Sequence, residues 1–537
     1  MSSENSQNNV MLPEGSRRDK GKDAQKINIM VAKAVSNAVK STLGPKGMDK
    51  MLVDELGDVT VSNDGATILK EMSIEHPVGK MLVELAKTQD SEVGDGTTSA
   101  VVIAGELISR AEFLLDENIH PSLIIKGYKM ASEKACQYFS EISQPITLDD
   151  KNLLLDIAKT SMTGKASDYS FYLSEIVVDS VLKINSKNKL EKESIKIEPK
   201  LGASLSDTKL IEGLVLDKEI LHPEMEKSLK NVKVVVISSA LEIKEPETDT
   251  KVQINTPEQL QSFIDQEENI LKEMVSKIKE SGAKFVFCQK GIDDLAEHFL
   301  AKEGISAIRR VKASDIERIS KASGARIISR INELSEKDLG FFGNISEKKI
   351  AGDNMLFLEN AKNPGQVTIL LRGSSEHVLA ETERTITDAI GAVISSIKTG
   401  KYVSGGGSSE IEVSLKIRNF AKTVGGREQL AIEAFADVLD VIPKILAESA
   451  GMDAIDTIVS LRSLHQDPKN MFFGVNVLKS DIKDMKSENV IEPLNLKLQV
   501  INSASEVVEM ILRIDDIIAA SSKNKSFNQN QMPFSGM

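Results

Sequence analysis

The sequence Thr-Gln-Asp-Ser-Glu-Val-Gly-Asp-Gly-Thr-Thr-Ser-Ala-Val-Val-Ile-Ala-Gly, residues 88–105, joins a Gly-Asp-Gly turn to an apolar run. Asp95 lies between two glycines, where the backbone can turn tightly and approach a ligand. The apolar run predicts a buried helix, so the loop would end at a helix N-terminus whose free N–H groups favour a phosphate. The Asp95 carboxylate would offer Mg²⁺ a hard oxygen. The same residues also fit an ordinary turn with a Thr or Ser cap, and this stretch alone leaves both interpretations open.

Three other segments, far apart in the sequence, have the same glycine-rich character. They are Leu-Gly-Pro-Lys-Gly at 43–47, Ser-Asn-Asp-Gly-Ala-Thr at 62–67 and Val-Ser-Gly-Gly-Gly-Ser at 403–408. One loop of this kind is weak evidence for a ligand site, because glycine also occurs in ordinary turns. Four such loops, two of them with an embedded aspartate, predict that distant parts of the chain meet as the walls of a nucleotide site.

Two further segments make the pattern specific. Lys-Thr-Gln-Asp occupies 87–90, and Gly-Gly-Arg-Glu-Gln-Leu-Ala-Ile-Glu-Ala-Phe-Ala occupies 425–436. Together with the four loops, these segments closely resemble the group II chaperonins, which comprise the archaeal thermosome and the eukaryotic cytosolic chaperonin. The resemblance extends from about residue 20 to the C-terminus.

The composition limits the class of protein. A chain of 537 residues is too long for one hydrophobic core, so we expect about two to four domains. Hydrophobic residues make up 41% and charged residues 27%, which is ordinary for a soluble globular protein. The net charge of −13 argues against a nucleic-acid partner, because a protein that binds nucleic acid would present a basic face.

Cysteine and histidine usage adds to these limits. Cys136 and Cys288 are too far apart for a CxxC motif, and the six histidines show no zinc-ligand spacing. So few cysteines indicate a reducing compartment. No apolar stretch is long enough to predict a membrane span, and we therefore expect a cytoplasmic protein.

The two ends of the chain are predicted to be mostly α-helical. Residues 1–20 are polar and predict a flexible tail. Apolar residues recur at helical spacing from residue 23 to 43, and Gly44-Pro45 ends that helix. Residues 51–53 and 59–61 predict a β-hairpin. The remaining periodic segments predict an all-α block around this one hairpin; they are residues 78–142, with three long helices, 408–465 and 490–520.

The central part of the chain has a different pattern of apolar residues. Short apolar runs at 232–237, 284–287 and 305–308 predict strands, which alternate with predicted helices at 292–302 and 314–323. Such alternation is typical of an α/β domain. A long predicted helix at 375–398 then returns to the first block.

A long insertion, from Glu245 to Lys277, follows the first of these strands. Thr256-Pro257-Glu258 favours a helix start there, because proline suits the first helical position. Leu260, Phe263 and Ile264 then lie at helical spacing among many charges, more apolar groups than an element without a partner needs. The insertion occupies the place where group II chaperonins carry a protrusion that acts as a built-in lid, although this face could also pack on its own domain.

The resemblance implies a multidomain α and α/β protein in a nested order. It implies a mostly α-helical, discontinuous equatorial ATP-binding domain, a mixed intermediate hinge domain, and an α/β apical client-binding domain with a helical protrusion. The expected ranges are 1–20 for the tail, 21–145 and 404–537 for the equatorial domain, 146–216 and 373–403 for the intermediate domain, 217–372 for the apical domain, and about 245–277 for the protrusion.

The resemblance also implies ATP and Mg²⁺ as ligands. Asp95 matches the magnesium-binding aspartate of the family, and Asp64 matches a catalytic carboxylate at the floor of the site. Asp388, in Thr-Asp-Ala-Ile-Gly, matches an intermediate-domain aspartate that activates the attacking water. Taken alone, Asp388 would be a charged residue on the solvated face of a helix. A carboxylate that reaches the phosphate only when its domain rotates would couple hydrolysis to movement.

Other residues match nucleotide-binding positions of the family. Lys165 matches a lysine that senses the γ-phosphate, although a lone lysine is more often a surface charge. Glu492 matches an acidic residue near the ribose, and Gly474 a glycine near the adenine. The residues expected to approach phosphate or nucleoside are Leu43, Gly44, Pro45, Gly96, Thr97, Thr98, Ser99, Gly406 and Gly407.

The partners implied are unfolded or partly folded client proteins and identical or homologous subunits in two stacked rings of eight or nine. The apolar segment 532–537 could touch clients inside such a ring or could be a frayed end. An alternative is an ATP-dependent metabolic enzyme such as a kinase, but the sequence shows no acceptor pocket, catalytic histidine or nucleophile elbow. A non-catalytic scaffold fits less well, because Asp64, Asp95 and Asp388 are all retained.

Overall fold

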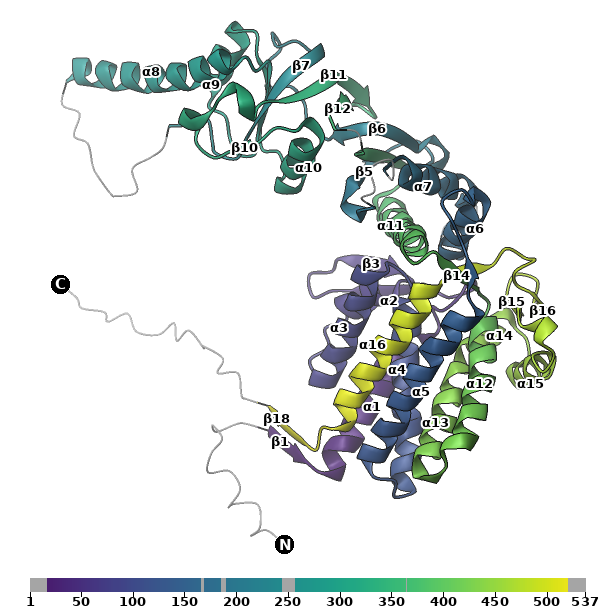
Figure 1. The fold of residues 1–537 in the computed structure, drawn as a ribbon. Coiled ribbons are helices and arrows are strands. Elements are labelled where there is room, and N and C mark those ends of the chain that lie inside the picture. The colour runs from purple at the N-terminus through teal and green to yellow at the C-terminus, as the bar shows by residue number, and fades with distance from the viewer. Residues whose placement is uncertain (1–16, 166–168, 185–189, 244–255, 364, 520–537) are drawn as a thin grey trace, which may run out of the picture.

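The structure is a computed structural model, and it describes residues 17–165, 169–184, 190–243, 256–363 and 365–519. The molecule is elongated and curved, with a bundle of helices at one end and a twisted sheet at the other (Figure 1). Buried side chains form three large hydrophobic cores along it. We call them the helical core, the middle core and the sheet core.

The helical core is built by helices from both ends of the chain. In α1, Ile29, Ala32, Val35 and Val39 face it at the spacing of one helix face, and α4 is apolar on nearly every side because other helices surround it. The helices are α1 (Lys22–Lys40), α2 (Gly65–Glu71), α3 (Pro77–Glu92), α4 (Thr97–Asp116), α5 (Pro121–Ile142), α12 (Ser408–Val424), α13 (Gly426–Leu439), α14 (Val441–Ala450), α15 (Ala454–Leu464) and α16 (Leu494–Leu512).

Short strands lie beside the helices of the helical core. The predicted hairpin is confirmed as β2 (Lys50–Val53) paired with β3 (Val59–Ser62). The other short strands were not predicted, because two to four residues rarely carry a distinctive pattern. They are β4 (Gln144–Pro145), β14 (Lys401–Ser404) and β17 (Ile491–Pro493), which form the order β17-β14-β4, and the hairpin of β15 (Phe473–Asn476) and β16 (Asp481–Asp484).

The predicted N-terminal tail needs one correction. Its last four residues form β1 (Arg17–Lys20), which pairs antiparallel with β18 (Asp516–Ala519). Polar residues can form such a strand pair because its hydrogen bonds come from the backbone. The polar composition of residues 1–20 therefore predicted a flexible tail where the chain forms a strand. Residues 1–16 and 520–537, which include the apolar segment 532–537, lie outside the described residues.

The middle core joins α6 (Lys151–Met162), α7 (Ser170–Ile184) and α11 (Glu376–Thr399) to the parallel strands β5 (Ile195–Leu201) and β13 (Val367–Gly373). The structure confirms the long helix predicted at 375–398. Val367, Ile369 and Leu371 pack in this core, although the expected ranges placed them with the sheet region. The reason is that β13 pairs with β5, a partner far away in sequence.

The sheet core confirms the predicted α/β alternation. Strands β7, β8 and β9 are parallel, and α8 and α9 lie between them in sequence. The whole sheet has the order β5-β13-β6-β12-β11-β7-β8-β9, with β10 against β7, so it runs from the middle core into the sheet core. The remaining elements are β6 (Lys209–Leu216), β7 (Ser228–Ile237), β8 (Phe285–Cys288), β9 (Ser306–Ile308), β10 (Ile327–Ile328), β11 (Gly340–Ile350), β12 (Asp353–Ala361), α8 (Pro257–Ser281), α9 (Asp294–Lys302) and α10 (Ala313–Ser323).

Helix α8 projects from this region (Figure 1). It begins at Pro257, as the Thr-Pro-Glu signal predicts. Its C-terminal half buries Leu271, Val275 and Ile278 in the sheet core, whereas Phe263 and Ile264 in the other half are 43% and 45% exposed. The helix therefore has one anchored half and one half with exposed apolar groups. The first part of the predicted insertion, residues 245–255, lies outside the described residues.

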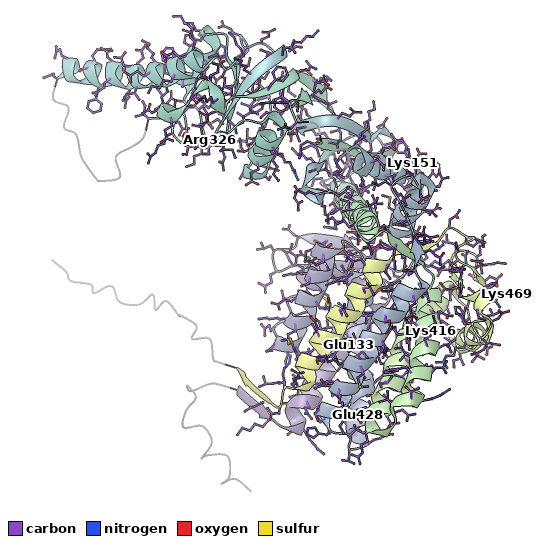
Figure 2. All side chains as sticks on the ribbon, viewed as in Figure 1. Glu133, Lys151, Arg326, Lys416, Glu428 and Lys469 are labelled. Atoms are coloured by element: carbon purple, nitrogen blue, oxygen red, sulfur yellow. The ribbon has the colours of Figure 1, made fainter. Side chains whose placement is uncertain are left out.

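Charged side chains cover all three parts of the molecule. Figure 2 labels Glu428 on the helical block, Lys151 beside the middle core and Arg326 on the sheet region. Several make surface ion pairs, such as Lys151 with Asp179 at 2.7 Å. Among the helices that the structure describes, none is long and apolar enough to cross a membrane.

Candidate nucleotide site

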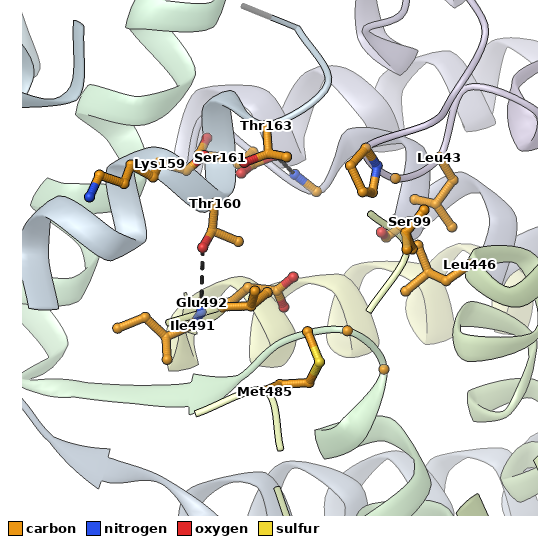
Figure 3. Close-up of a pocket in the computed structure, with 18 of the residues that line it drawn as sticks. Leu43, Ser99, Lys159, Thr160, Ser161, Thr163, Leu446, Met485, Ile491 and Glu492 are labelled. Carbon is orange, nitrogen blue, oxygen red and sulfur yellow. Dashed lines mark hydrogen bonds between the residues drawn. The ribbon is translucent and has the colours of Figure 1, made fainter. Parts of the chain in front are cut away.

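A cavity of about 520 Å³ lies where the helical core meets the middle core. The predicted glycine-rich loops all reach it: the turn after α1, the turn before α2, the α3–α4 loop and the β14–α12 loop contribute to its walls. Helix α6 and Ala392 of α11 line it from the middle core. Figure 3 shows labelled lining residues from these walls, with Thr160 and Thr163 of the α6 region facing Met485 and Glu492 across the space.

Two helices begin at the cavity without a side-chain cap. The N-cap residues of α4 and α12 are Gly96 and Gly407, with φ of 77° and 76°, a left-handed conformation that favours glycine. Neither residue has a side chain to accept from the first N–H groups of its helix. These helices have 20 and 17 residues, so each presents the positive end of a full helix dipole to the cavity. The arrangement favours an anion such as phosphate.

The Asp64 carboxylate is fixed by hydrogen bonds from two helices. Its Oδ2 accepts from the backbone N–H of Thr67 at 2.8 Å, and its Oδ1 accepts from the Thr97 hydroxyl at 2.8 Å. Burial alone would raise the pKa of Asp64, but the Lys165 ammonium and these hydrogen bonds outweigh it and hold the pKa below its usual value. Asp64 is therefore an ionised carboxylate at the start of α2.

The Asp95 loop is braced from inside. The buried Gln89 side chain donates to the backbone oxygen of Asp95 at 2.8 Å, and Asp95 Oδ1 accepts from the Gly96 N–H at 2.7 Å. The Asp95 carboxylate is half-buried and lines the cavity. A carboxylate beside two helix N-termini can hold a metal ion that also contacts phosphate, because Mg²⁺ takes one or two carboxylates and completes its shell with phosphate and water.

Asp388 reaches this region from the middle core. It lies on α11, is buried, and accepts a hydrogen bond from Lys165 Nζ at 2.7 Å. Burial raises the pKa of Asp388, and the carboxylates of Asp64 and Asp95 act in the same direction. Burial would lower the pKa of Lys165, but the three carboxylates together raise it. One ammonium group thus lies among three carboxylates, an excess of negative charge that a divalent cation would balance.

The other end of the cavity combines apolar lining residues with acidic ones, of which Glu492 is one. Leu43, Leu446 and Met485 line it, and Glu492 points into the space between them and Thr160 (Figure 3). The N–H of Ile491 donates to the Thr160 hydroxyl at 3.4 Å, which links β17 to α6.

Glu492 belongs to a buried charge cluster. It forms a close ion pair with Lys497, whose Nζ also lies 2.7 Å from Glu410 Oε1. Burial raises the pKa of Glu492, and Lys497 acts against this. Lys497, in the first turn of α16, therefore holds one carboxylate from the first turn of α12 and one from β17.

The structure brings most of the predicted site residues together. Those that line the cavity are Leu43, Gly44, Pro45, Asp64, Asp95, Gly96, Thr97, Thr98, Ser99, Lys165, Gly406, Gly407 and Glu492. Asp388 contacts Lys165 without lining the cavity itself. Gly474 does not line it either and lies behind the wall: a Cβ atom there would be 2.8 Å from the Gly406 backbone oxygen. Their roles remain predictions.

Sequence reasoning missed several charged groups near the site. Burial raises the pKa of Asp90, and nearby Asp64 raises it further, while Lys192 and Lys165 act against this. Lys497 and Glu410 were also missed. Asp90 lies in the quoted Lys-Thr-Gln-Asp segment and could have been singled out there, but isolated charges such as Lys192 carry no sequence signal.

Comparison with known proteins identifies the class. The model of the TCP-1/cpn60 chaperonin family matches residues 35–522, and the chain belongs to that family. Within it, the similarity is to thermosome subunits, so the chain is a group II chaperonin, a molecular chaperone subunit. The chain is 54% identical over 521 residues to thermosome subunit alpha of Archaeoglobus fulgidus, covering 96% of this chain and 95% of that protein. It is 53% identical over 513 residues to the thermosome subunit of Methanothermococcus thermolithotrophicus, covering 95% and 94%.

Proposed function

We propose that this chaperonin subunit binds Mg²⁺-ATP in the cavity between the helical and middle cores and hydrolyses it to drive protein folding. The observation that supports this most is the meeting of two uncapped helix N-termini with a carboxylate from another core. The N-termini of α4 and α12 favour phosphate. Asp388 lies on α11 of the middle core and reaches the site by its ion pair with Lys165.

Each charged group has a distinct role in this proposal. Asp95 holds the metal ion, which when bound neutralises charge on the phosphates. The excess of carboxylates over lysine around Lys165 fits such an ion. Lys165 binds the γ-phosphate, and Asp64 orients the phosphate end through Thr97. Asp388 orients the attacking water and accepts its proton.

The nucleoside would occupy the end of the cavity that Glu492 lines. Glu492 accepts hydrogen bonds from ribose hydroxyls, and Lys497 holds it in place. Leu43, Leu446 and Met485 offer apolar contact to the adenine ring. Gly474 packs against the backbone of Gly406 on the side away from the cavity. Its lack of a side chain therefore leaves space for the β14–α12 loop.

Movement of α11 would couple hydrolysis to enclosure of a client. Asp388 lies in the middle core and the helix N-termini in the helical core, so relative rotation of the two cores makes or breaks the site. In this proposal subunits assemble into two stacked rings of eight or nine. The exposed half of α8 binds unfolded clients in the open ring and contacts neighbouring lids in the closed ring. Free Cys136 and Cys288 are compatible with a reducing cytoplasm.

Asp388→Ala tests this function directly. The variant should lose about 10²-fold or more of kcat for ATP, since a positioned base contributes that much. Its Kd for Mg²⁺-ATP should stay near that of the unmodified chain, because Asp388 acts on the water. Isothermal titration measures Kd, and a steady-state ATPase assay measures kcat. The Asp388→Ala variant should also lose the ability to refold a denatured client, because refolding depends on ATP turnover.

Glu376→Ala provides the control, since Glu376 is an exposed carboxylate in the first turn of the same helix. It should leave both quantities unchanged. Equal losses of binding and turnover in Asp388→Ala would show that the assigned role is wrong.

A further inference from the structure

Two glycines meet where α11 crosses the loop that carries Asp95. A Cβ atom on Gly391 of α11 would lie 2.5 Å from the Val93 backbone oxygen and 3.0 Å from Gly94 Cα. A Cβ atom on Gly94 would lie 3.2 Å from Gly391 Cα and 3.6 Å from the Asp388 backbone oxygen. The two backbones are therefore in direct contact, with no side chain between them.

This contact joins two cores. Ala389, Ile390 and Val393 of α11 are buried in the middle core, whereas Val93 belongs to the helical core. Gly94 has a φ of 82°, so its own conformation already favours glycine. The backbone conformation does not explain a glycine at position 391, since this residue lies inside the 24-residue helix α11. Glycine is the least favourable residue in a helix interior after proline, so another requirement has placed it there.

The requirement is the position of Asp388. Residues three apart lie on the same face of a helix, so Asp388 and Gly391 face the Asp95 loop together. A carbon atom 2.5 Å from the Val93 oxygen is well inside the contact distance, so any side chain at 391 must lift α11 from the loop by roughly 0.7 Å or more. Asp388 would move with the helix, away from Lys165 and the phosphate end.

We propose that Gly391 is a positioning residue for hydrolysis: its bare backbone seats α11 on the Asp95 loop and so places Asp388 over the phosphate end of the site. The inference rests on the proposed function, because it gives Gly391 its effect only through Asp388. Gly391 touches no reacting atom. Its contribution is the close approach of two backbones that belong to different cores.

Gly391→Ala is the test. It adds one methyl group and replaces glycine by the best helix former, so α11 itself gains helix propensity. We expect kcat for ATP to fall by about tenfold or more, because a displacement near 1 Å of a reacting group has effects of this size. The Kd for Mg²⁺-ATP should not change. Gly391→Val should lower kcat further, since its side chain is larger.

Thr387→Ala is a matched control on the same helix, since its hydroxyl donates to the Glu383 backbone oxygen one turn earlier in α11. It should keep normal kcat and Kd. The melting temperature and ring assembly of every variant, checked by light scattering, exclude misfolding as the cause.

A double variant separates positioning from a general packing defect. In the Asp388→Ala background, single-turnover hydrolysis should be no slower with Gly391→Ala than without it. An equal loss in both backgrounds, or a loss of nucleotide binding, would overturn the inference. Normal turnover in Gly391→Ala with a defective Asp388→Ala would overturn the inference and leave the proposed function standing. Normal turnover in Asp388→Ala itself would refute the catalytic role proposed for Asp388, and the inference with it.

Discussion

At the cavity, single residues are held by partners from distant parts of the chain. The Asp64 carboxylate accepts a hydrogen bond from Thr97, 33 positions away, as well as one from neighbouring Thr67, and Asp388 pairs with Lys165, 223 positions away. Such pairing fixes the direction of each carboxylate before a ligand arrives. Preorganised charge is effective in a site that excludes water, because it need not reorganise during the reaction.

Asp95 should govern metal-dependent binding. Asp95→Ala removes the half-buried carboxylate beside the α4 N-terminus, so Mg²⁺-ATP should bind at least tenfold more weakly. ATP without Mg²⁺ should bind the variant no more weakly than it binds the unmodified chain, since a repulsive charge is gone. Titration with and without Mg²⁺ measures both. Asp116→Ala, at the exposed far end of α4, is the control, and unchanged Mg²⁺-ATP affinity in Asp95→Ala would contradict the metal role.

Lys497 should be important for stability. Lys497→Met leaves the buried Glu410 carboxylate and the partly exposed Glu492 carboxylate without their cation, which should cost about 3 kcal/mol. A carboxyl group with a raised folded-state pKa binds its proton more readily in the folded than in the unfolded state, so stability falls as pH rises. The variant should therefore melt much earlier than the unmodified chain at pH 8, and the gap should narrow toward pH 5.

Thermal melting across that pH range measures the effect. Adding Glu410→Gln to Lys497→Met should restore part of the stability at pH 8, because one unpaired charge is removed. A gap between the two melting temperatures that does not depend on pH would contradict the assignment of the cluster.

The sequence could predict the loops of the site better than its isolated charges. The Gly-Asp-Gly and Gly-Gly-Gly loops are unusual strings, and left-handed backbone at Gly96 and Gly407 explains why they stand out. Lys497 and Lys192 are single lysines among many, and only the fold decides which lysine is buried. Asp388 was found through a resemblance, since its helix pattern alone predicts an exposed residue.

At the scale of elements, length and periodicity decided what could be predicted. Long amphipathic helices such as α1 and α11 were predicted to within a few residues, because one face packs on a core at regular spacing. Strands β14 and β15 have four residues each, too few for a distinctive local pattern, and β14 pairs with β17 and β4, which are distant in sequence.

Helix α8 carries the prediction at this scale. Replacing residues 252–266 with a Gly/Ser linker of equal length should leave subunit folding and ATP hydrolysis intact, because the buried anchor begins at Leu271. An enclosed client should then become open to protease in the presence of a transition-state analogue of ATP. Gel analysis of client digestion measures this protection, and full protection with the linker would show that α8 is not a lid.

Phe263→Ser with Ile264→Ser is a finer variant. Both side chains are exposed in the single subunit, so their loss should not affect its melting temperature. If these groups contact clients or neighbouring lids, client capture or protection should fall although the helix is kept.

At the scale of the whole molecule, the fold places three cores in a row, with the cavity at the junction of the helical and middle cores (Figure 1). Such a subunit exposes a large surface on every side, and closed symmetric assembly is the usual way to cover it. The proposed double ring should therefore give particles of about 1 MDa from subunits of 58.6 kDa. Native mass spectrometry measures the particle mass, and fully active ATPase from a species of 58.6 kDa would refute obligatory assembly.

The discontinuous helical core also has a consequence during synthesis on the ribosome. Helices α1 to α5 emerge first, but their packing partners α12 to α16 begin about 260 residues after Ile142. At typical elongation rates, that separation corresponds to tens of seconds in which the faces of α4 and α5 that pack on α13 and α16 have no partner. β1 must wait longer still, since β18 is made almost last. A nascent subunit of this protein is thus itself an unfolded chain with exposed apolar surface. Other chaperones would need to protect it before it can assist the folding of any client.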